Sequence, residues 1–168
     1  MSVKLPKSTR VSKAEISYAR ELLREYGGRL YFRNMLRRNA GPIGAAAEVD
    51  LQTKSVSLER VLLRDRAAFW SAIFHEMGHL YCQQNNIYRA YHVTALKEKL
   101  TAKEKRALVQ TGWRAETYVD RWGAKEMSKY FPDLKYQPGY SLKEHKQWLH
   151  DTYLCYYKDQ RYLKNRPQ

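Results

Sequence analysis

Long hydrophobic runs are absent from this chain, and their absence limits where the protein can work. None of its 168 residues falls in an apolar stretch of about 20, the length that a membrane-spanning helix needs. The first residues, MSVKLPKSTR, lack the apolar segment of a secretory signal. The sequence therefore predicts a cytoplasmic protein with no membrane segment. We expect a single domain over residues 1–168, with a loose basic N-terminus over 1–11.

Cysteine is equally scarce, since the chain contains only Cys82 and Cys155. Two cysteines do not make a disulfide framework, so stability must come from an apolar core. A chain of this length is long enough to bury one. We interpret both cysteines as buried thiols, although Cys82 follows His79 by three positions and could lie close to a metal ion.

Acidic residues are few compared with basic ones: 17 Asp and Glu stand against 31 Lys and Arg, for a net charge of +14. Such an excess favours acidic partners, of which nucleic acid is the obvious class. Cations are dense over residues 1–38 and again over 158–166. The competing interpretation is a solvated basic surface that only aids solubility. Nucleic acid therefore enters as a candidate partner.

What the chain does contain is a cluster of metal-ligating side chains in the segment AFWSAIFHEMGHLY, residues 68–81. His75, Glu76 and His79 form the pattern H-E-x-x-H, a known signature of zinc metalloproteases. Residues four apart on a helix share one face, with Cβ atoms about 5–6 Å apart. Both imidazoles can then reach one zinc ion at about 2.0–2.1 Å. Glu76, beside the ion, can take a proton from a metal-bound water.

The residues around this pattern favour a helix. Apolar side chains recur at helical spacing, and Asp65 is suited to cap the first turn. Asn85 or Asn86 could end the helix in a left-handed turn. A glycine in mid-helix costs roughly 1 kcal/mol relative to alanine. We therefore expect another backbone, or the metal, to approach closely at Gly78.

A second set of informative residues lies on one face of an expected helix over 112–127. This face consists of Trp113, Glu116, Asp120, Gly123 and Met127. Carboxylates on an apolar face are costly unless they find partners. A catalytic zinc needs a third protein ligand and an open fourth position, and Glu116 can be that ligand. Asp120, one turn later, can accept a hydrogen bond from a ligating histidine and fix its tautomer.

The rest of the chain predicts an α+β fold that is mainly helical. The capping-box pattern of Ser12 and Glu15 predicts a helix that continues to about Tyr26. Alternating residues over 45–58 predict a β-hairpin beside the metal helix. A free edge on that hairpin could pair with an extended peptide.

Two further segments are harder to interpret. Residues 30–35 fit either a short strand or a segment at the edge of a helix. Residues 83–111 form an insertion between the two metal-ligand helices, with a charged helical segment over 95–110 and a second capping-box pattern at Thr101 and Glu104.

The two metal-ligand motifs together resemble the gluzincin class of zinc metallopeptidases, and more narrowly the ImmA/IrrE family, over residues 42–132. That family joins a β-hairpin to an H-E-x-G-H helix and then uses an E-x-x-A-[ND]-x-F-A helix. Here the first motif reads HEMGH and the second reads ETYVDRWGA. The second motif departs from the family pattern at Val119, Trp122 and Gly123.

This resemblance implies a zincin-like fold and a zinc-dependent peptidase with one Zn²⁺ per chain. His75, His79 and Glu116 would hold the ion, Asp120 would orient a ligand, and Glu76 would be the general base. The substrate would be a peptide or protein, such as a DNA-associated or regulatory protein. The oxyanion would need a stabilising group. The candidates are Tyr118, Tyr140, His145 and His150.

Two other interpretations stay open. An SprT-like DNA-associated protease would use His92 as its third ligand, although the glycine expected next is Val93. The other is a non-enzymatic nucleic-acid-binding protein with a structural zinc. Tyrosines and cations interleave over 153–166, and such a segment can hold single-stranded nucleic acid by stacking and phosphate contact. The intact Glu76 argues against a purely structural zinc, because a closed site needs no general base. The sequence leaves the oligomeric state open.

Overall fold

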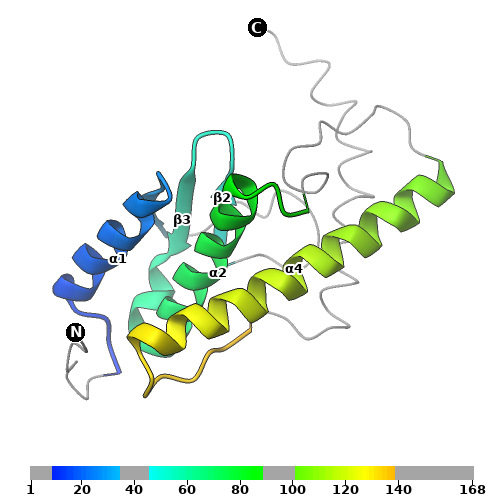
Figure 1. The fold of residues 1–168 in the computed structure, drawn as a ribbon. Coiled ribbons are helices and arrows are strands. Elements are labelled where there is room, and N and C mark those ends of the chain that lie inside the picture. The colour runs from blue at the N-terminus through cyan, green and yellow to red at the C-terminus, as the bar shows by residue number, and fades with distance from the viewer. Residues whose placement is uncertain (1–8, 35–45, 89–100, 139–168) are drawn as a thin grey trace, which may run out of the picture.

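The computed structural model describes residues 9–34, 46–88 and 101–138, and within these ranges the chain is α+β (Figure 1). Three α-helices accompany a three-stranded sheet. The elements in chain order are α1 (Lys13–Glu25), β1 (Arg29–Arg33), β2 (Ala47–Asp50), β3 (Ser55–Glu59), the 3₁₀ helix η1 (Arg60–Arg64), α2 (Arg66–Gln84) and α4 (Ala102–Tyr130). None of the helices in these ranges is both long enough and apolar enough to cross a membrane.

The sheet confirms the expected hairpin, formed by β2 and β3. It also shows that the ambiguous segment before the hairpin contains a strand, β1. Its order is β1-β3-β2, with β2 antiparallel and β1 parallel to β3. The Asp50 carboxylate accepts hydrogen bonds from the backbone N–H groups of Gln52 and Thr53, at 2.9 and 3.3 Å, and shapes the hairpin turn. Within the described residues, β2 pairs only with β3 and so presents a free edge.

The expected capping box begins α1 and also reaches into the core. The side chain of Ser12 accepts from the backbone N–H of Glu15, whose carboxylate accepts from the N–H of Ser12. The same carboxylate accepts from Arg66 Nε at 2.7 Å and from Trp70 Nε1 at 3.1 Å. Burial raises the pKa of Glu15, but these hydrogen bonds outweigh it and leave the pKa lowered. Glu15 thus joins α1 to α2.

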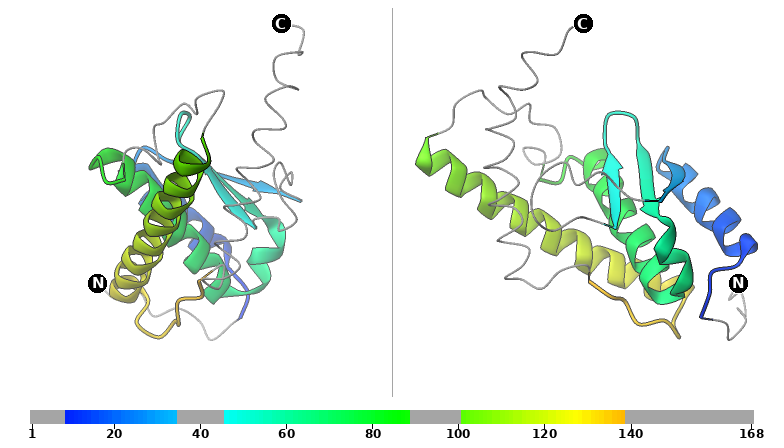
Figure 2. Two further views of the ribbon diagram at one scale, coloured as in Figure 1. Left: turned by 90° about the vertical axis from the view of Figure 1, so that its right-hand side faces the viewer. Right: turned by 180° about the vertical axis from the view of Figure 1, so that it is seen from behind.

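Helix α2 is the centre of the molecule, because it lies between the sheet and α4 (Figures 1 and 2). Asp65 caps its start by accepting from Ala68 N–H, and Asn86 follows its end in a left-handed conformation with φ 54°. Phe69, Trp70 and Ile73 are fully buried in a core shared with α1, β1, β3 and α4.

Helix α4 is a single helix of 29 residues, which corrects the expectation of two separate helical segments. From Ala102 on, the charged segment expected over 95–110 is helical and continues without a break into the helix expected over 112–127, while residues 95–100 lie outside the described ranges. Gly112 is buried inside the helix and does not end it. The expected insertion over 83–111 is likewise partly helix, since its ends belong to α2 and α4.

Candidate metal centre

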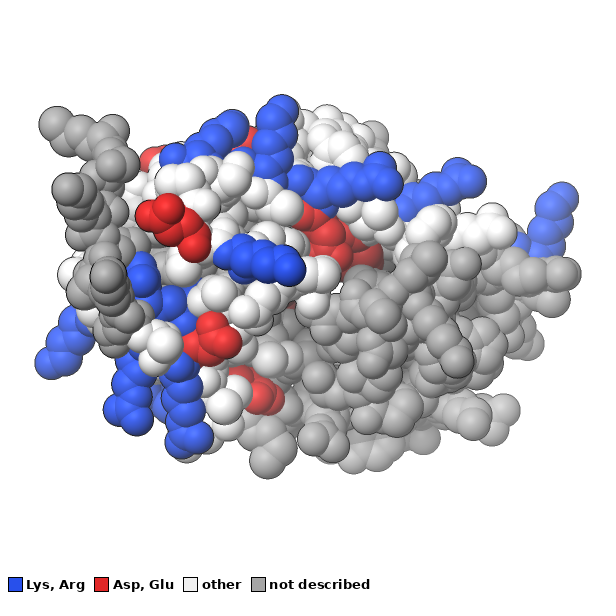
Figure 3. Space-filling view, turned by 90° about the horizontal axis from the view of Figure 1, so that it is seen from below, with Lys and Arg blue, Asp and Glu red and all other residues white. Residues whose placement is uncertain are grey.

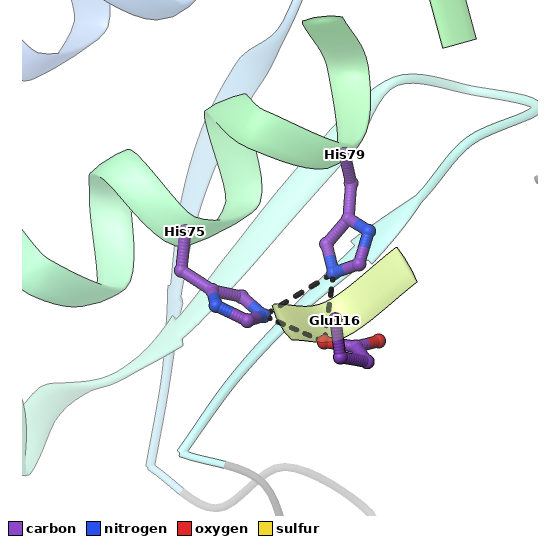
Figure 4. Close-up of side chains that lie close together, drawn as sticks. All are labelled: His75, His79 and Glu116. Atoms are coloured by element: carbon purple, nitrogen blue, oxygen red, sulfur yellow. Dashed lines mark hydrogen bonds and ion pairs between the residues drawn. The ribbon is translucent and has the colours of Figure 1, made fainter. Parts of the chain in front are cut away.

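Two helices bring three ligating side chains together (Figure 4). His75 and His79 come from successive turns of α2, and Glu116 comes from α4. The Nε2 atoms of the two histidines are 3.2 Å apart. Glu116 Oε2 lies 3.1 Å from His75 Nε2 and 3.4 Å from His79 Nε2. Among the described residues, this is the one group of three or more side chains whose ligand atoms converge in this way.

The spacing of these atoms fits a divalent metal ion. Two ligand atoms at about 2.0–2.1 Å from one ion, in tetrahedral directions, lie about 3.3–3.4 Å from each other. The three distances, from 3.1 to 3.4 Å, match that separation. Imidazole nitrogen and carboxylate oxygen are electron-rich, so their convergence requires a proton or a cation between them. Three protein ligands would leave a fourth position open.

Two glycines allow α2 and α4 to approach closely enough to form this group. A Cβ added to Gly78 would lie 2.8 Å from Val119 Cγ1 and 3.2 Å from Trp122 Cε3. A Cβ added to Gly123 would lie 3.2 Å from the backbone C and O atoms of Phe74. Close approach at Gly78 was expected from the sequence. It sets the distance between the histidines of α2 and Glu116 of α4.

A hydrogen-bonded chain of side chains orients His75. Asp120 Oδ1 lies 2.9 Å from His75 Nδ1 and accepts from Tyr136 Oη–H at 2.8 Å. Because an ionised carboxylate only accepts, His75 carries a proton on Nδ1, and its other ring nitrogen, Nε2, points towards His79 and Glu116. Burial and the nearby negative charge of Asp120 raise the pKa of Tyr136, so the tyrosine is a neutral donor. The role expected for Asp120 has the geometry it requires.

The charges within this group stabilise one another. Burial lowers the pKa of His75, but the carboxylates of Asp120 and Glu116 outweigh this and raise it well above its usual value. Burial raises the pKa of Glu116, but the charge of His79 and hydrogen bonds from both histidines lower it well below its usual value. Glu116 is therefore ionised, as a metal ligand must be.

Glu76 is a buried carboxylate with no hydrogen bond to any other described residue. It is only 5% exposed, and burial raises its pKa. The charges of His75 and His79 oppose this increase, while those of Glu116 and Glu48 add to it. Buried charges without a partner are costly. Such a group, beside three side chains that could hold a metal ion, is suited to exchange a proton with a water molecule.

Other residues considered from the sequence are placed elsewhere or are not described. Cys82 is a buried free thiol whose ligand atom does not belong to the converging group. Burial and the charge of Glu116 raise its pKa to about 11, which suits the structural role expected for it. Tyr118 follows Glu116 by two positions and so projects from the opposite side of α4, where its ring packs on Tyr88 at 5.8 Å. The residues that lie outside the described ranges are His92, Tyr140, His145, His150 and Cys155.

One residue of the site could not have been found from the sequence. Tyr136 lies after α4 in a segment without regular structure, 16 positions beyond Asp120, so no periodic pattern connects the two residues. Comparisons with protein-family models, with curated proteins and with solved structures found no match to this chain. Its function must therefore be inferred from the residues and their arrangement.

Proposed function

We propose that this protein is a zinc-dependent peptidase in which His75, His79 and Glu116 hold the ion and Glu76 is the general base. One observation carries the proposal. Three candidate ligand atoms from two helices lie 3.1–3.4 Å from one another, and the buried carboxylate of Glu76, which has no hydrogen bond to another described residue, comes directly after His75 in the chain. A structural site would have no use for that carboxylate.

The choice of zinc follows from the ligand set. Two imidazoles and one carboxylate, with a fourth position open, are a common set for catalytic zinc. When bound, zinc supplies Lewis acidity that lowers the pKa of a coordinated water to about 7 and polarises a carbonyl group. No ligand in this set is a thiolate, which fits a hydrolytic site better than a structural one.

The chain's own residues supply the remaining functions. Glu76 would take a proton from the attacking water and pass it to the leaving amine. Asp120 and Tyr136 would hold His75 in the tautomer that presents Nε2. The free edge of β2, a strand that contacts α2, would pair with the backbone of an extended peptide. The source of oxyanion stabilisation is not assigned.

The first test replaces Glu76. We expect Glu76→Gln to retain zinc and to lose cleavage of a peptide library by at least about 100-fold, because the amide cannot accept the proton. Zinc content would be measured by atomic spectroscopy and cleavage by mass spectrometry. Glu25→Gln makes the same chemical change at an exposed position of α1 and should retain full activity. Full cleavage by the Glu76 variant would disprove the proposed mechanism.

The same measurements identify the third ligand. If Glu116 holds the ion, Glu116→Ala loses zinc and His92→Ala keeps it. The SprT-like alternative predicts the reverse. The convergence of Glu116 with both histidines favours the first outcome.

A further inference from the structure

The outer face of α4 carries a row of cations that the proposed peptidase does not use. Lys103, Arg114, Arg121 and Lys125 are all exposed. They are separated by 11, 7 and 4 positions, so at 3.6 residues per turn they lie within about 40° of one another around the helix axis. We call these four residues the α4 basic stripe. In Figure 3, Lys and Arg side chains line the upper edge of the view, along α4.

The charges of the stripe are not neutralised within the described part of the chain. None of the ion pairs found there involves any of its four cations. Helix α1 differs, because the exposed Glu21 and Glu25 stand among its own exposed cations. Since like charges on one helix face repel each other, the stripe is a surface that an anionic partner would stabilise.

The stripe faces away from the metal-binding triad. Glu116 follows Arg114 by two positions, which places it about 200° around the helix. The N-terminal half of α4 also projects beyond α2 and the sheet (Figures 1 and 2). A large partner could therefore bind along the stripe without covering the group formed by His75, His79 and Glu116.

The length of the stripe excludes a compact anion. Lys103 and Arg114 are about 16 Å apart along the axis, and the whole stripe spans about 33 Å at a rise of about 1.5 Å per residue. One turn of duplex DNA covers about 34–36 Å, with a phosphate charge about every 1.7 Å along its axis. We propose that the α4 basic stripe docks on the phosphate backbone of duplex DNA, so that the metal centre works beside DNA.

This docking does not depend on the peptidase activity. Contacts between cations and phosphates carry no sequence information, so binding would be independent of DNA sequence. It would weaken as salt displaces the protein from the phosphates, with a slope of log K against log salt of about −0.9 per contact. The four cations of the stripe would together contribute about −3.6 to this slope.

The test compares two triple variants with equal loss of charge. One is Arg114→Gln, Arg121→Gln and Lys125→Gln on α4. The other is Lys13→Gln, Arg20→Gln and Arg24→Gln on the exposed face of α1. Affinity for a labelled duplex of about 20 base pairs, roughly two turns, would be measured by fluorescence anisotropy between about 50 and 200 mM salt. Thermal melting would check that both variants fold.

We expect the α4 variant to make the salt slope shallower by about 2.7, and the α1 variant to leave it unchanged. Glu76→Gln should bind DNA as wild type does, which separates this result from any failure of the peptidase. Equal losses in the two triple variants would show that net charge alone drives binding and would overturn the proposal. Absent or salt-independent binding by wild type, or tighter binding of a single strand than of the duplex, would also overturn it.

Discussion

Asp120 is the residue on which the orientation of His75 depends, because a single carboxylate oxygen accepts from both His75 and Tyr136. Tyr136 contacts no ligand atom of the triad, so it is a positioning residue that acts through Asp120. Residues that orient a metal ligand in this way commonly change metal affinity by about 10–100-fold when they are removed.

We therefore expect Tyr136→Phe to weaken zinc binding by about 10-fold while keeping the fold, because only one hydroxyl is lost. Competition with a chromophoric chelator would measure the affinity. Tyr130→Phe is the matched control, since the Tyr130 ring packs on Phe74 and Phe131 and its hydroxyl does not contact Asp120. Equal zinc affinity in the two variants would show that Tyr136 only fills space.

Among the individual residues of the site, those on regular helices could be predicted from the sequence, and those on irregular segments could not. Glu116 and Asp120 were predicted because a helix puts residues four apart on one face. The part of Glu15 in the capping box was also predicted. Its contacts with Arg66 and Trp70 were not, because they join positions 51 and 55 residues away.

Helices α2 and α4 pack closely because each presents a glycine to the other. The closer contact is between Gly78 and Val119, one of the residues that departs from the ImmA/IrrE pattern. At 2.8 Å, an added Cβ and Val119 Cγ1 cannot coexist without movement of one helix. Such movement would also change the distance from His75 and His79 to Glu116.

We expect Gly78→Ala to destabilise the protein although alanine favours helix. Overpacking of this kind costs about 1–3 kcal/mol, while the gain in helix propensity is about 1 kcal/mol at most. Zinc affinity should fall in parallel. Urea denaturation of the zinc-free protein would measure the free energy of unfolding.

A second substitution tests the cause. Val119→Ala removes the clashing methyl group, so Gly78→Ala should be less harmful in that background by more than about 0.5 kcal/mol. If the effects of the two substitutions are simply additive, the contact with Val119 does not explain why position 78 needs glycine.

Elements with a strong local pattern were predicted and those set by distant pairing were not. The hairpin and the start of α2 follow from alternation and capping in adjacent residues. Strand β1 could not be distinguished from a helix edge, because its parallel pairing with β3 joins residues 26 positions apart. The α4 basic stripe could not be predicted from the sequence for a related reason. Lys103 and Arg114 align only if one continuous helix includes both.

In the molecule as a whole, one helix carries residues of both proposed sites, on opposite sides. Towards the core, α4 presents Glu116 and Asp120 to the histidines of α2; towards solvent, it presents the basic stripe. A metal ion at the triad would join α2 to α4 through ligands that are far apart in sequence. In an unfolded chain these side chains are not gathered, so a metal ion would bind the folded state preferentially and would stabilise it.

Zinc should therefore raise the melting temperature of the whole protein. At a free zinc concentration about 1,000 times the dissociation constant, the stabilisation is about 4.1 kcal/mol. For a chain of this size, each kcal/mol corresponds to about 2–4 °C, so we expect a rise of roughly 8–16 °C by scanning calorimetry. Glu116→Ala should abolish the rise because a ligand is lost, while Glu76→Gln should keep it because that residue holds no metal. If zinc does not change the melting temperature of the wild-type protein, the convergence of His75, His79 and Glu116 serves packing alone.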